Sequence, residues 1–153
     1  MKGKIHSKSL SRYLAVQAIF NHSFGFDHKQ IEKEFVSQND FKFHVDLDFD
    51  VGKKTFDKVF FKKIFNNVFE NEDFIRSLIS KNLENTWTFQ RLPKVLQALL
   101  RVAISEMITY PKTSMGIIIT EYLMLAESFS IEKDNNFINA ILDKIHKKLE
   151  IHE

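Results

Sequence analysis

The feature that most constrains the fold of this chain is the helical periodicity of its last third. From Trp87 onward, apolar residues recur every three or four positions in three successive runs, which predicts three amphipathic helices. We expect Pro93 in the first turn of the earliest helix and the Tyr110–Pro111 pair at its end. The predicted core positions are, run by run, Leu92, Leu96, Leu99, Ala103 and Met107; Ile118, Ile119, Tyr122, Leu125, Ala126 and Phe129; and Ile138, Ile141, Leu142, Ile145 and Leu149.

Four more helices are predicted earlier in the chain from the same kind of spacing. Their expected ranges are 9–24, 28–38, 55–69 and 71–83. Only four glycines and two prolines occur in 153 residues, so the chain holds little material for the turns of a many-stranded sheet. We therefore expect an all-α fold of about seven helices in two small helical bundles, packed as one domain over residues 1–153. The N-terminal subdomain would cover about 8–70 and the C-terminal subdomain about 71–150.

One segment departs from the helical pattern. Residues 41–51 alternate strictly between apolar and polar side chains, which is typical of a strand, and no second alternating run exists to pair with it. Two interpretations stay open. The segment is an extended connection that lays its apolar side chains on the helices, or it is an edge that pairs with its copy in a homodimer.

Composition excludes several classes of protein. The chain has no cysteine, which rules out disulfides and thiolate metal sites. No apolar run is long enough to span a membrane, and the N-terminus lacks the apolar core of a secretory signal, so we expect a cytoplasmic protein. The six histidines do not pair with acidic residues at metal-site spacing, and no phosphate loop or nucleophile motif is present. We expect no catalysis, no metal and no cofactor.

The distribution of charge points instead to binding. Lys2, Lys4, Lys8 and Arg12 place four cations in the first twelve residues, with no acidic residue among them. A basic arm that leads into a helix is suited to a phosphate backbone. A frayed, solvated terminus would have the same composition.

The order and spacing of residues in two stretches resemble the NusB family of bacterial transcription antitermination factors. One stretch is RYLAVQAIF at residues 12–20, and the other runs from residue 87 to residue 145. The matching residues of the second stretch are Trp87, Arg91, Leu92, Val95, Ala98, Leu100, Arg101, Ala103, Glu106, Glu121, Leu125, Ala126, Phe129, Phe137, Asn139, Leu142, Asp143, Lys144 and Ile145.

This resemblance implies an all-helical RNA-binding factor. Such a factor binds the single-stranded boxA element of nascent ribosomal RNA together with the ribosomal protein NusE, within the antitermination complex on RNA polymerase. The RNA-binding residues it implies or that the charge pattern adds are Lys4, Lys8, Arg12, Gln17, Phe20, Asn136, Phe137 and Lys144. The partner-binding residues it implies are Arg101, Glu106 and Glu121.

Alternatives to these roles remain at the level of sequence. Phe137 and Phe20 would stack RNA bases by resemblance, but an aromatic near a helix start is also an ordinary core residue. Gln17 lies within an apolar arc, where either a structural hydrogen bond or a contact with RNA explains it. Lys133 stands where the family often has an aspartate, and Leu96 where it commonly has an acid. A helical protein-interaction module that has lost RNA binding, or a detached NusB-like domain of an RNA methyltransferase, would share the fold.

Overall fold

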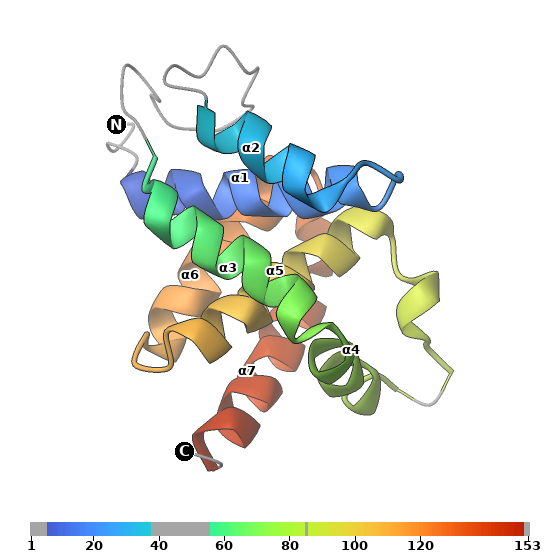
Figure 1. Ribbon diagram of the computed structural model, residues 1–153. Coiled ribbons are helices and arrows are strands. Elements are labelled where there is room, and N and C mark those ends of the chain that lie inside the picture. The colour runs from blue at the N-terminus through green and yellow to red at the C-terminus, as the bar shows by residue number, and fades with distance from the viewer. Residues whose placement is uncertain (1–5, 38–55, 85, 152–153) are drawn as a thin grey trace.

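The structure is a computed structural model, and it describes residues 6–37, 56–84 and 86–151. Within these ranges the chain forms seven α-helices and two short 3-10 helices and contains no strand, which confirms the all-α prediction. The elements are α1 (Ser7–His22), α2 (His28–Ser37), α3 (Lys58–Glu70), α4 (Glu72–Lys81), η1 (Phe89–Arg91), α5 (Lys94–Thr109), α6 (Met115–Ser128), η2 (Glu132–Asp134) and α7 (Asn135–Ile151) (Figure 1). The alternating segment 41–51, with the dimer edge it could provide, lies outside the described residues.

Side-chain caps set the starts of two helices. The Asp57 carboxylate accepts a hydrogen bond from the Phe60 N–H, so α3 begins at Lys58 and not at Thr55 as predicted. The Ser114 hydroxyl accepts one from the Ile117 N–H at the start of α6. Pro93 lies one residue before its predicted place. Its ψ of 143° is extended, so it occupies the N-cap of α5 and the helix begins at the next residue.

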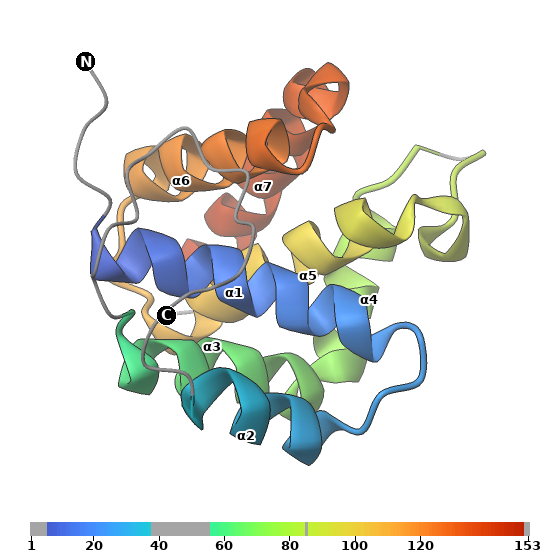
Figure 2. The ribbon, with the colours of Figure 1, turned by 90° about the horizontal axis from the view of Figure 1, so that it is seen from above.

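Helix α5 is the centre of the molecule. It packs against α1, α3, α4, α6 and α7, and the buried side chains of all these helices belong to one hydrophobic core. Figure 2 shows α1 crossing the middle of the view, with α2 and α3 on one side and α6 and α7 on the other. Because helices from both ends of the chain meet at α5, residues far apart in sequence are brought together there.

The predicted core faces of the last three helices are largely confirmed. All five positions predicted in the first run are buried, and so are four of the six in the second run and four of the five in the third. The exceptions are Ile119, Phe129 and Leu149, which are half-buried against the same core. Within the described residues, no helix combines the length and the apolar character needed to cross a membrane.

The connection between α6 and α7 fixes where the last helix starts. Ser130 adopts a φ of 60°, in the left-handed region that glycine enters most easily. The backbone N–H of Ser130 donates to the Glu127 carbonyl, and that of Ile131 donates to the Ala126 carbonyl at 2.8 Å. These bonds close the end of α6 and lead directly through η2 into the first turn of α7, which carries Asn136 and Phe137.

Candidate nucleic-acid interface

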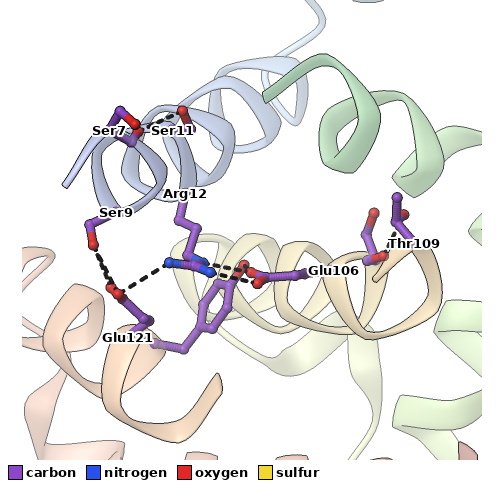
Figure 3. A network of polar contacts seen from close by, with 9 residues as sticks. Ser7, Ser9, Ser11, Arg12, Glu106, Thr109 and Glu121 are labelled. Atoms are coloured by element: carbon purple, nitrogen blue, oxygen red, sulfur yellow. Dashed lines mark hydrogen bonds and ion pairs between the residues drawn. The ribbon is translucent and has the colours of Figure 1, made fainter. Parts of the chain in front are cut away.

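Arg12, the last cation of the predicted basic arm, points into the protein and not into solvent. Only 5% of the residue is exposed, and its guanidinium donates two hydrogen bonds to the fully buried Glu106 carboxylate, at 2.7 and 2.8 Å (Figure 3). A third nitrogen, Nη1, lies 3.1 Å from a carboxylate oxygen of Glu121. The guanidinium also lies over the ring of Phe60, 5.1 Å from its centroid.

Further hydroxyl groups complete this network. The Tyr122 hydroxyl donates to Oε1 of Glu106 at 2.8 Å, and the Ser9 hydroxyl lies 2.9 Å from both carboxylate oxygens of Glu121. The network therefore joins α1 to α5 through Glu106 and to α6 through Glu121 (Figure 3). We call these five residues, Ser9, Arg12, Glu106, Glu121 and Tyr122, the Arg12 network.

Burial and charge both shape ionisation within the Arg12 network. Burial by itself would lower the pKa of Arg12, but the hydrogen bonds and charge of Glu106 outweigh it and raise the pKa above its ordinary value. Burial and the neighbouring Glu106 carboxylate raise the pKa of Tyr122 well above its ordinary value, although Arg12 opposes the shift. Arg12 is therefore charged and Tyr122 neutral, which is the combination that satisfies Glu106.

These positions correct part of the sequence-based assignment. Arg12 was expected to attract RNA, and Glu106 to meet a protein partner, but both are buried and their polar atoms are engaged with each other. Arg101 is also only 5% exposed, and its Nη2 lies 3.4 Å from Glu72. Burial, followed by the charge of Arg76, lowers the pKa of Arg101. Glu121 is half-buried and keeps 18% of its side chain exposed beside Arg12.

The other N-terminal residues lie in different surroundings. Lys4 is outside the described residues. Lys8 is exposed, with its ammonium 5.6 Å from the centroid of the Phe60 ring. Gln17 is half-buried and its side-chain amide donates to the Asn21 side chain at 3.1 Å, so a hydrogen bond one helical turn along α1 satisfies it. Lys8 is the one predicted cation of the arm that the described structure leaves at the surface.

A groove brings the remaining predicted residues together at the other end of the sequence. It has a volume of about 680 Å³ and lies between the α4–α5 connection and the first turns of α7. Asn136, Phe137 and Lys144 line it, with Asn136 and Lys144 exposed and Phe137 half-buried. We call this feature the Phe137 groove. Its full lining is Asn82, Glu84, Trp87, Arg91, Leu92, Pro93, Leu96, Lys133, Asp134, Asn136, Phe137, Ala140, Ile141 and Lys144.

Sequence reasoning did not assign Trp87 or Arg91 to a binding site. Trp87 is 55% exposed and Arg91 is exposed, and both line the Phe137 groove. Trp87 precedes the helical run of α5, so no periodicity marks its direction. The available signal was its type, because it is the single tryptophan of the chain. Lys133, noted as an added positive charge, also lines the groove.

Phe20 contributes to a second aromatic surface. It is half-buried near the end of α1, and its ring meets the exposed Phe24 edge to face, with 4.9 Å between centroids. The Lys94 ammonium lies 6.0 Å from the centroid of the Phe24 ring. Lys94 directly follows Pro93, which lines the Phe137 groove, so the two aromatic surfaces adjoin through this dipeptide.

Comparisons with known proteins agree with the fold and the sequence pattern. The model of the NusB family matches residues 9–147. A protein of Rickettsia massiliae named transcription antitermination protein NusB is 32% identical over 151 residues, covering 95% of this chain and 94% of that protein. The protein of the same name from Rickettsia bellii is 33% identical, covering 93% of this chain and 91% of its own length. The structure of T. maritima NusB superposes with a TM-score of 0.71 at 27% identity, over 95% of this chain and 93% of that one.

Proposed function

This chain belongs to the NusB family of transcription antitermination proteins, and we propose that it acts in transcription antitermination by binding single-stranded RNA in the Phe137 groove. The RNA would be a boxA-type element of nascent ribosomal RNA. The ribosomal protein NusE would bind with it, within the antitermination complex on RNA polymerase. The proposal places the protein in the cytoplasm and assigns it a binding role, with no catalysed reaction.

The observation that carries this proposal is the placement of an accessible aromatic ring among cations. Phe137 lies in the same groove as Arg91, Lys133 and Lys144, all three of which are exposed. Among the described residues, no carboxylate is within ion-pairing distance of these three cations. They are therefore available to neutralise phosphates while the ring receives a base.

This combination suits a single strand better than a duplex. In an A-form helix the bases are stacked on one another, and their faces are closed to protein side chains. An unpaired base can leave the stack and enter a groove that has an aromatic wall. The two carboxylates that also line the groove, Glu84 and Asp134, can accept hydrogen bonds from the amino groups of such a base.

The proposal is tested by the binding of labelled single-stranded RNA to the purified protein, measured by fluorescence anisotropy at low and moderate salt. A boxA-like RNA is compared with a scrambled one, each with and without NusE. The informative variant is Phe137→Ala. The matched control is Phe74→Ala, because Phe74 is 49% exposed on α4 and is not among the residues that line the groove.

Three results distinguish the possibilities. Preference for the boxA-like RNA, strengthened by NusE and weakened by Phe137→Ala but not by Phe74→Ala, supports the proposal. Binding of NusE without any preference among RNAs would contradict it and favour a protein-interaction module that has lost RNA binding. Binding to neither would contradict both functions.

A further inference from the structure

We propose that Trp87 is a second base-stacking residue, so that the Phe137 groove holds one unpaired RNA base between the rings of Trp87 and Phe137. The inference rests on the proposed function, since it takes RNA to be the occupant of the groove. It adds a residue from the α4–α5 connection, a part of the chain distant in sequence from α7.

The first step is that Trp87 is exposed although the connection that carries it is firmly held. Phe89 and Leu92, which follow it, are each 3% exposed. The Gln97 side-chain amide donates to the Phe89 carbonyl at 3.0 Å and to the Leu92 carbonyl at 2.8 Å. The Trp87 N–H donates to the Glu84 carbonyl at 2.9 Å, which closes a turn just before it. The indole is thus presented to solvent by a fixed segment.

The second step is that the groove leaves room for a ligand beside the indole. Among the described residues, no ring contact is formed by Trp87 and none by Phe137, although both line the same groove. The volume of about 680 Å³ is within the range of small-molecule sites, so a nucleotide base fits. An exposed tryptophan is uncommon, because its large apolar ring favours burial, and stacking on a base would provide that burial.

The third step is the charge around the two rings. Arg91 lies on the side of Trp87, and Lys144 lies on α7 with Phe137. With Lys133, the groove has three cations against the two carboxylates Glu84 and Asp134. A net positive groove with an aromatic residue on each side matches the general composition of single-strand binding sites, in which cations follow the backbone and rings receive the bases.

The single tryptophan makes the inference directly measurable, because all tryptophan emission comes from Trp87. The experiment titrates the full chain with unlabelled boxA-like RNA while this emission is recorded, and measures affinity in parallel by anisotropy of labelled RNA. The variants are Trp87→Ala, Trp87→Phe, Phe137→Ala and the double variant Trp87→Ala/Phe137→Ala, with Phe74→Ala as the control.

We expect RNA to quench the emission in the wild-type protein. Trp87→Ala should weaken binding by about 5- to 150-fold, the range that corresponds to one stacked base, and Trp87→Phe should restore most of the loss. Because both rings would hold the same base, the double variant should lose less than the product of the two single losses. Thermal unfolding should stay near wild type in Trp87→Ala, since the side chain is mostly exposed.

Other results would overturn the inference. RNA binding with unchanged emission, and with wild-type affinity in Trp87→Ala, would refute the role of Trp87 and leave the proposed function intact. Quenching by NusE alone, without RNA, would show that the ring meets protein. Losses that multiply in the double variant would show that the two rings act on different bases. Failure of every variant and of the wild type to bind RNA would refute the proposed function, and this inference with it.

Discussion

The Arg12 network and the Phe137 groove are built from the same kinds of residues and have opposite surroundings. Each combines cations, carboxylates and an aromatic ring. In the Arg12 network, the guanidinium and Glu106 are buried and bonded to each other. In the Phe137 groove, Arg91 and Lys144 are exposed, and Phe137 is half-buried.

The difference between the two regions teaches that residue type alone does not separate a folding role from a binding role. A buried cation needs fixed partners, and once it has them it has nothing left to offer a ligand. An exposed cation without a carboxylate partner keeps its donors for phosphates. We therefore expect changes in the Arg12 network to affect stability first, and changes in the Phe137 groove to affect RNA affinity first.

The largest expected effect is that of Arg12→Ala. Removing the guanidinium leaves the fully buried Glu106 without its cation, and breaking a buried ion pair in this way typically lowers the free energy of unfolding by about 3–5 kcal/mol. Chemical denaturation monitored by circular dichroism measures the change. The double variant Arg12→Leu/Glu106→Leu serves as its control, because it removes both charges and should recover a large part of the loss. A single variant as stable as wild type would contradict the structural role.

Phe137→Ala should have the next largest effect, this time on binding. Loss of one stacked base weakens RNA affinity by about 1–3 kcal/mol, whereas the half-buried ring should contribute less to stability than a core phenylalanine. The measurement pairs RNA affinity with the denaturation midpoint of the same preparation. A protein that loses stability but keeps its RNA affinity would place Phe137 in the same class as Arg12, and the contrast between the two regions would fail.

Lys144→Ala should change how RNA binding depends on salt. If its ammonium neutralises one phosphate, the slope of log affinity against log salt should become shallower by about 0.7, the value for one contact on a single strand. Lys147→Ala is the matched control, because Lys147 is on the same helix, is paired with Asp143 at 3.0 Å and is not among the residues that line the groove. Equal slopes in Lys144→Ala and the wild type would show that this lysine meets no phosphate.

The smallest effect expected is a pH dependence of stability that arises from His22. Burial, the charge of Arg101 and the charge of His28 lower the pKa of His22 below 6.5. The unfolded chain therefore binds this proton more readily than the folded one, and the free energy of unfolding falls as the pH falls from about 6.5 through the folded pKa. His22→Gln should make stability less dependent on pH in that window. Parallel curves for the variant and the wild type would exclude His22 as the cause.

Much of the fold could be predicted from the sequence because the pattern is local. The runs that contain Leu99, Tyr122 and Leu142 repeat with helical spacing, and these residues are buried as that spacing requires. The exact helix starts were harder to place. Asp57 and Pro93 each shift a boundary through cap geometry that periodicity does not report.

The candidate site could be predicted less well because it depends on long-range packing. Arg12 and Glu106 are separated by 94 positions, and only the packing of α1 on α5 reveals that they neutralise each other. Trp87 belongs to a connection without periodicity, so its neighbours in the groove follow from the tertiary fold. In contrast, Asn136, Phe137 and Lys144 are close in sequence on one helix, and they were predicted together.

The most direct test of the central claim, that the Phe137 groove binds RNA while the Arg12 network holds the fold, is a chemical-shift titration of isotope-labelled protein with single-stranded boxA-like RNA. The account predicts that the largest shifts occur at the indole N–H of Trp87 and the backbone of Asn136 and Phe137. The backbone signals of Arg12 and Glu106 should stay nearly in place. The largest shifts at Arg12 and Glu106, with an unchanged indole signal, would contradict it.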